Sequence, residues 1–173
     1  MKRFVSVLIA CMLFVSLASA DSFGLSVKRF VAEYNYQSDK RLESIDSGTV
    51  FGSGDSQYMR LNADTGVDIF LRYADSVDSD LTGIIVMQDA NSTDMEKFIS
   101  VCTTATYVLS GYTVDPEDFT RRYYQPYFSV CSALSYYGYS GKSSPVSVIG
   151  YTVQYQIQDG NRQLAISPND QKE

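Results

Sequence analysis

The stretch from Thr93 to Gly138 constrains the fold most, because it predicts two consecutive helices in the middle of the chain. Thr93 and Glu96 match a capping box, in which the glutamate reaches back to the free amides of the first turn. Gly111 is expected to end this first helix. Its apolar residues recur at helical spacing and predict one buried face: Met95, Phe98, Ile99, Cys102 and Leu109.

A second helix is expected to start at Asp115-Pro116, with aspartate as the cap and proline at the first helical position. Pro126 should break or kink it, because proline lacks the N–H that an inner helical turn requires. The piece after Pro126 again has an apolar face, which we expect to point inward: Val130, Cys131, Leu134 and Tyr137. The sequence therefore predicts a central helical layer.

Strands are expected before and after this helical stretch in the sequence. Val67 to Tyr73 alternates apolar and polar residues, which indicates a strand with one buried face. Leu81 to Met87 is nearly all apolar, as in a strand covered on both faces. After the helices, Val146 to Gln158 predicts one long strand, which a tight turn at Asp159-Gly160-Asn161 joins to a returning strand at Gln163 to Ile166.

The first part of the mature chain predicts a further helix and two shorter strands. Ser26 is a suitable N-cap for a helix from Val27 to about Tyr36. Ser44 to Asp55 is rich in Ser, Gly and Asp, which predicts a loop or a weak strand around Thr49–Phe51, and a strand is expected at Gln57 to Leu61. Together the elements predict an α+β fold, in which an antiparallel sheet of about five or six strands packs one face against an N-terminal helix and the central helices.

The first 20 residues predict a cleaved signal peptide. A short positive start precedes an apolar run from Phe4 to Leu17, and Ala18-Ser19-Ala20 fits a signal-peptidase site. Residues 21–173 then form a single domain, with a mobile polar tail from about residue 167. A secreted or periplasmic location follows from this interpretation. The alternative is a lipoprotein anchored at Cys11, because residues 8–11 read Leu-Ile-Ala-Cys.

Charge and composition exclude several classes of function. Removing the signal peptide leaves 12 basic and 20 acidic residues, a formal net charge of −8. A chain this acidic lacks the basic surface that nucleic acid or anionic membranes require. The sequence contains no histidine, which argues against Ser-His-Asp and Cys-His catalysis and the usual catalytic zinc sites. We therefore expect no cofactor, no metal and no transmembrane helix in the mature chain.

Two cysteines remain after cleavage, and in an exported protein they predict a disulfide bond. Cys102 and Cys131 each lie on the apolar face of a predicted helix. A bridge closing a loop of this size would stabilise the fold by roughly 3–4 kcal/mol in the chain-entropy picture.

A cluster of tyrosines predicts a contact surface. Tyrosine combines rigid apolar area with a polar tip and is enriched in binding surfaces. Tyr123, Tyr127 and Tyr137 are expected to face mainly inward, since they fit the amphipathic pattern. The remaining tyrosines and two nearby arginines form the candidate surface: Arg121, Arg122, Tyr124, Tyr136 and Tyr139.

Three functions are compatible with these features. The first is a small exported binding protein without enzymatic activity, which acts through protein–protein contact as an inhibitor, an immunity factor or an accessory subunit. The second is a periplasmic carrier of a small apolar or sugar ligand held between helices and sheet. The third is a hydrolase that uses carboxylates alone, which needs two acids converging in a cleft.

Overall fold

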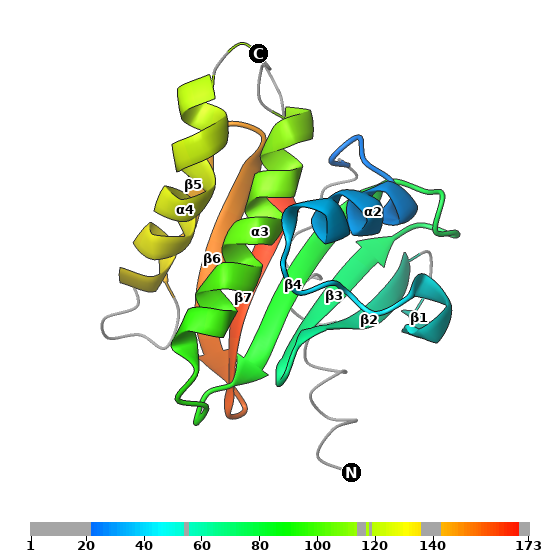
Figure 1. Cartoon of the computed structure of the whole chain (residues 1–173), viewed down its shortest axis with the longest axis horizontal. Helices are drawn as coiled ribbons and strands as arrows, with labels where there is room; N and C mark the ends of the chain where they lie inside the picture. The colour runs from blue at the N-terminus through cyan, green and yellow to red at the C-terminus, as the bar shows by residue number, and fades with distance from the viewer. Residues whose placement is uncertain (1–21, 54–55, 114–116, 118, 136–142, 170–173) are drawn as a thin grey trace.

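The computed structural model describes residues 22–53, 56–113, 117, 119–135 and 143–169 (Figure 1). It shows an α+β fold with one seven-stranded antiparallel sheet in the order β1-β2-β3-β4-β7-β6-β5. The described helices α2, α3 and α4 all lie on one face of this sheet (Figure 1). The predicted fold class is confirmed, and the sheet has seven strands rather than five or six.

The first half of the chain forms α2 (Val27–Gln37), β1 (Thr49–Ser53), β2 (Ser56–Asp64), β3 (Val67–Tyr73) and β4 (Leu81–Asp89). The helix starts where the cap predicts it, since the Ser26 hydroxyl accepts the Arg29 N–H at 3.3 Å. Leu25 before the cap and Phe30 inside the helix are both buried, as in a hydrophobic staple.

The second half forms α3 (Met95–Thr113), α4 (Phe119–Ser135), β5 (Val146–Val148), β6 (Tyr151–Gln158) and β7 (Asn161–Pro168). The single long strand predicted over 146–158 is wrong. Gly150 has a φ of 87°, a conformation that favours glycine, and it reverses the chain so that β5 pairs back onto β6. The predicted turn into β7 is present, and Asp159 and Gly160 both have positive φ.

The helix end predicted at Gly111 is wrong, because Gly111 lies inside α3. Pro126 was expected to break or kink the next helix, and α4 is not broken there but continues to Ser135. Pro126 cannot donate to the carbonyl four residues earlier, which belongs to Arg122. The hydroxyl of buried Ser110 on α3 reaches that carbonyl at 3.4 Å. The single proton of this hydroxyl is shared with the Tyr107 carbonyl, which lies closer at 2.8 Å, so the neighbouring helix replaces only part of the hydrogen bond that the proline removes.

The main core lies between the helices and the sheet, where Phe30, Tyr34, Phe98 and Tyr151 are its largest buried rings. A second cluster lies on the opposite face of the sheet, because side chains alternate along each strand. Its members come from neighbouring strands: Phe51, Tyr58, Phe70, Ile85, Met87 and Ala165.

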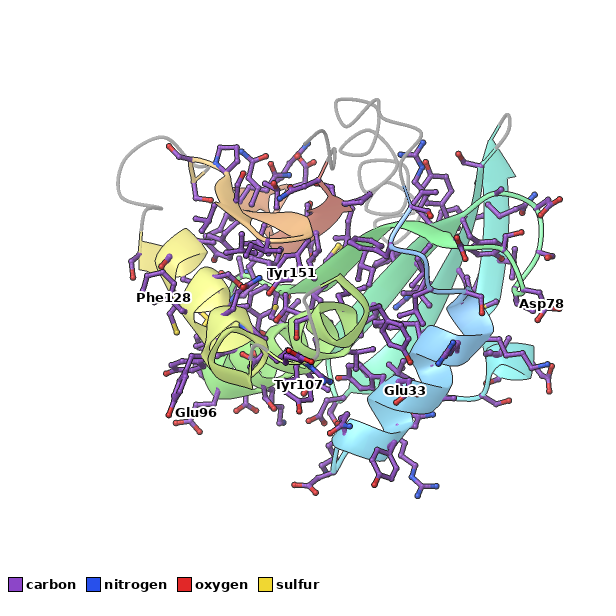
Figure 2. All side chains as sticks on the ribbon, turned by 90° about the horizontal axis from the view of Figure 1, so that it is seen from above. Glu33, Asp78, Glu96, Tyr107, Phe128 and Tyr151 are labelled. Carbon is purple, nitrogen blue, oxygen red and sulfur yellow. The ribbon has the colours of Figure 1, made fainter. Side chains whose placement is uncertain are left out.

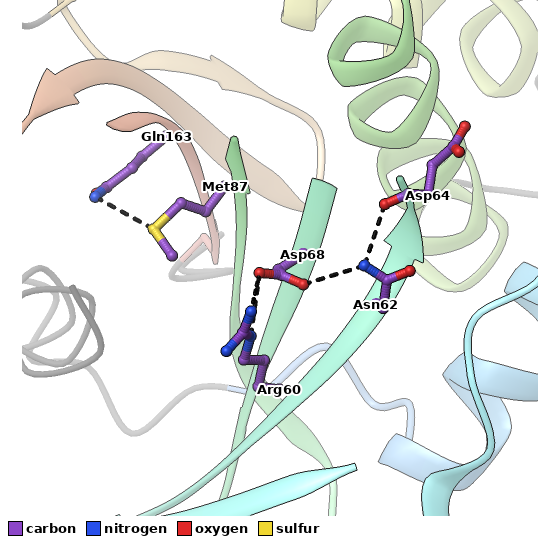
Figure 3. Close-up of polar contacts among 6 residues, drawn as sticks. All are labelled: Arg60, Asn62, Asp64, Asp68, Met87 and Gln163. Atoms are coloured by element: carbon purple, nitrogen blue, oxygen red, sulfur yellow. Dashed lines mark hydrogen bonds and ion pairs between the residues drawn. The ribbon is translucent and has the colours of Figure 1, made fainter. Parts of the chain in front are cut away.

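Polar contacts flank this second cluster. Arg60 of β2 forms an ion pair with Asp68 of β3 at 2.6 Å, and Asn62 hydrogen-bonds the backbone carbonyl of Asp64 (Figure 3). On the other flank, the side-chain amide of Gln163 contacts the sulfur of Met87 (Figure 3).

The ordered C-terminal part extends further than the sequence predicts. Ser167, where a mobile tail was expected to begin, is buried in β7. Asn169 then ties the strands together, since its side-chain amide donates to the Val148 carbonyl at 2.6 Å and its carbonyl oxygen accepts from Thr152. Residues 170–173 lie outside the described part of the chain.

Candidate contact groove on the helical face

A groove runs along the outer side of α3, between α2 and α4. Three adjoining concavities of about 520, 290 and 290 Å³ form it. Gln37 at the end of α2 borders all three, and Tyr107 of α3 borders the larger one and one of the smaller ones. Figure 2 shows Tyr107 with α4 on one side and Glu33 of α2 on the other. We call this feature the helix groove.

The wide end of the helix groove is aromatic and uncharged. Tyr107, Tyr124 and Tyr127 surround the 520 Å³ concavity together with Pro126 and polar uncharged side chains. Tyr124 and Tyr127 are 63% and 59% exposed, so a binding partner could cover a large apolar area there. The Thr103 hydroxyl at this end is buried and has no hydrogen-bond partner within the described part of the chain.

The narrow end of the helix groove carries two arginines. Arg29 of α2 and Arg122 of α4 border the same 290 Å³ concavity, with Gly111 and Tyr112 of α3 beside them. The Arg29 guanidinium lies 4.9 Å from the centre of the Tyr112 ring. The Tyr112 hydroxyl donates to a carboxylate oxygen of Glu33 at 3.0 Å. Burial, followed by this hydrogen bond, raises the pKa of Tyr112, which stays a donor at neutral pH.

Two of the five predicted surface residues lie in the helix groove. Arg122 borders the narrow end and Tyr124 the wide end. Arg121 is part of α4, but its side chain is outside the described set. Tyr136 and Tyr139 also lie outside the described residues.

The remaining tyrosines include one that the sequence analysis placed on the wrong side of its helix and two that it did not select. Tyr127 was expected to face inward and is instead largely exposed. The side chains of Tyr123 and Tyr137 are outside the described set. The sequence analysis did not select Tyr107 and Tyr112, because it used the apolar residues of α3 to predict the face that packs on the sheet and did not consider the opposite face. A usable signal was present, since Thr103, Tyr107 and Gly111 recur at a spacing of four and share the other face.

The predicted disulfide is not present in the structure, where Cys102 and Cys131 are both free thiols. Cys102 is fully buried with the core residues of α3, and burial raises the pKa of its thiol well above the usual value. Cys131 is half-buried on α4 beside Tyr127, and its thiol, as a hydrogen-bond partner, raises the pKa of Tyr127. The two helices therefore turn their cysteines in different directions, one toward the sheet and one toward the surface.

Comparisons of the chain with protein-family models, with curated proteins and with solved structures find no match. The described residues contain no group of three or more Cys, Asp or Glu placed to hold a metal ion. Within the same residues, no helix combines the length and the apolar character needed to span a membrane. The case for function therefore depends on the helix groove.

Proposed function

We propose that this protein is a small exported binding protein without enzymatic activity, such as an inhibitor, an immunity factor or an accessory subunit. It acts through protein–protein contact, and the helix groove is its contact surface. The observation that carries the proposal is the wide end, where exposed Tyr124 and Tyr127 stand around a concavity of about 520 Å³. Tyrosine is among the residues that contribute most to the free energy of binding at protein interfaces.

The dimensions of the helix groove suit an extended segment of a partner protein. The α3 residues that border it run from Ser100 to Tyr112, which is roughly 18 Å along a helix axis. An extended chain covers that distance with about five or six residues. The tyrosine rings would contact apolar side chains of the segment, and the Gln37 amide would bond its backbone.

A carrier of a small apolar or sugar ligand is the second candidate. Its support is the volume of the wide end, which falls within the range of about 300–1,000 Å³ for small-molecule sites. However, the wide end lies on the outer side of the helices and not between helices and sheet. An open site of this kind covers less of a small ligand than an enclosed one, which favours the protein partner.

Alanine variants of the exposed aromatic residues on α4 test the proposal. Tyr124→Ala and Tyr127→Ala should each weaken binding to a captured partner by roughly tenfold, as expected for a contact tyrosine. Phe128→Ala is the matched control, because Phe128 is 67% exposed on the same helix but points away from Tyr107 (Figure 2).

The experiment uses affinity capture from the native compartment, followed by calorimetric titration of the purified partner. An equal loss in Phe128→Ala, or full affinity in both tyrosine variants, would remove the helix groove as the contact surface. Native mass spectrometry of the purified protein distinguishes the second candidate, since a carrier would retain a small molecule that Tyr124→Ala releases.

A further inference from the structure

Two arginines border the narrow end of the helix groove. Arg29 comes from α2 and Arg122 from α4, and both line the same 290 Å³ concavity. Among the described residues, ion pairs join Arg60 to Asp68 and Lys97 to Asp94, and neither groove arginine takes part in one.

The structure holds both arginines at the narrow end. Arg29 lies over the Tyr112 ring in a cation–π contact, while the Tyr112 hydroxyl is bound to Glu33. The backbone carbonyl of Arg122 is in contact with the Ser110 hydroxyl of α3 at 3.4 Å. Because they come from helices on opposite sides of α3, the two guanidinium groups can approach one bound group from two sides.

Gly111 leaves room for the Arg122 side chain. A Cβ atom at Gly111 would lie 3.3 Å from the Nη2 atom of Arg122, a tight contact that would shift the guanidinium. Gly111 is in α3, where glycine destabilises a helix by about 1 kcal/mol relative to alanine. The guanidinium thus occupies the space over α3 that the missing side chain leaves.

The charges at the narrow end match a singly charged anion. Arg29 and Arg122 contribute two positive charges and Glu33 one negative charge, so the concavity carries a net charge of about +1. Guanidinium groups bind carboxylates through paired N–H donors. We propose that the narrow end is a carboxylate-binding subsite, which takes the C-terminal carboxylate or an acidic side chain of the partner segment. This inference rests on the proposed function, because it names the group that the segment places beside the tyrosines.

Two small molecules that differ only in charge test the subsite directly. The probes are N-acetyl-tyrosine, which carries a carboxylate beside an aromatic ring, and N-acetyl-tyrosinamide, which lacks the charge. The full chain, labelled with ¹⁵N, is titrated with each probe while the arginine Nε–H signals are followed by NMR. The acid should shift the Arg29 and Arg122 signals in a saturable manner, and the amide should leave them unchanged.

Substitutions assign the effect to the two arginines. Arg29→Gln and Arg122→Gln should each weaken binding of the acid by roughly fivefold, and Gly111→Ala by a smaller factor, while it raises the stability of the helix. Arg41→Gln is the matched control, because Arg41 is exposed and does not border the helix groove. Equal binding of acid and amide, or an equal loss in Arg41→Gln, would overturn the subsite. Tighter binding of inorganic phosphate than of the acid would overturn the assignment to a carboxylate.

The outcomes separate the subsite from the proposed function. The titration needs no protein partner, so a saturable shift supports the subsite even when the tyrosine variants leave partner capture unchanged. Conversely, absence of any shift rejects the subsite, while weakened capture by Tyr124→Ala would still support the contact surface.

Discussion

Replacing Ser110 with alanine tests how α4 tolerates a proline in its interior. Pro126 leaves the Arg122 carbonyl without its helical donor. The Ser110 hydroxyl donates to the Tyr107 carbonyl at 2.8 Å and reaches the Arg122 carbonyl at 3.4 Å. Ser110 is fully buried, so Ser110→Ala removes a buried donor and should lower the free energy of unfolding by about 1–2 kcal/mol.

Pro126→Ala restores the N–H that the Arg122 carbonyl lacks. Alanine is better than proline in a helix interior by about 3 kcal/mol. Removal of the buried proline ring loses apolar burial, which lowers this gain by roughly 1–2 kcal/mol. The variant should therefore be about 1–2 kcal/mol more stable than the wild type. In the Pro126→Ala protein, Ser110→Ala should lower the free energy of unfolding by about 0.5–1 kcal/mol less than it does in the wild type. The difference is modest because a contact of 3.4 Å is long.

Urea unfolding of the wild type, both single variants and the double variant measures this coupling. Ser135→Ala combined with Pro126→Ala is the control pair, and its effects should add, because the Ser135 hydroxyl bonds the Cys131 carbonyl within α4. If the effects of Ser110→Ala and Pro126→Ala also add within about 0.3 kcal/mol, Ser110 is not the replacement donor.

Two further predictions concern a buried thiol and a buried phenol. A maleimide should label Cys131 in the folded protein and Cys102 only after unfolding, since Cys102 is fully buried. Peptide mapping identifies the adducts. A disulfide-linked peptide that contains both residues would contradict free thiols. Tyr151→Phe should change stability at neutral pH by less than about 0.5 kcal/mol, because the buried Tyr151 hydroxyl lies near Ser129 but makes no hydrogen bond of normal geometry with the described residues. Burial raises the pKa of Tyr151 to about 12, above an unfolded value of about 10. Ionisation of this phenol therefore leaves stability unchanged below about pH 10 and lowers the free energy of unfolding by an amount on the order of 2–3 kcal/mol as the pH rises to about 12. Urea unfolding across this range should show a smaller alkaline decline for Tyr151→Phe, and an identical decline in both proteins would refute the assignment.

The helix groove combines a local positive charge with an acidic chain. An excess of acidic residues over the whole molecule favours approach of a basic partner, because long-range attraction depends on net charge. The carboxylate-binding subsite that we propose at the narrow end would add a second condition, a carboxylate at one place on that partner. A basic protein with a terminal or side-chain carboxylate in an extended segment satisfies both conditions, which restricts the partners to be sought in capture experiments.

Local patterns predicted the elements that depend on neighbours in the sequence. Ser26 placed the start of α2, alternation placed β3, and Asp159-Gly160 placed the turn between β6 and β7. These signals are reliable because capping, strand alternation and positive φ each depend on a few consecutive residues. By contrast, local sequence could not show that α4 is not broken at Pro126, because the Ser110 hydroxyl that contacts the Arg122 carbonyl comes from another helix.

The sequence by itself therefore determined the fold class and most of the strands and helices, and it selected Arg122 and Tyr124 as surface candidates. Only the tertiary structure decided that β4 pairs with β7, which joins strands on either side of the helices into one sheet. It also decided that Arg29 faces Arg122 across α3, although 93 positions separate them in the sequence. The physical reason is that such contacts depend on how whole elements pack, and no periodicity within one element records the position of its neighbour.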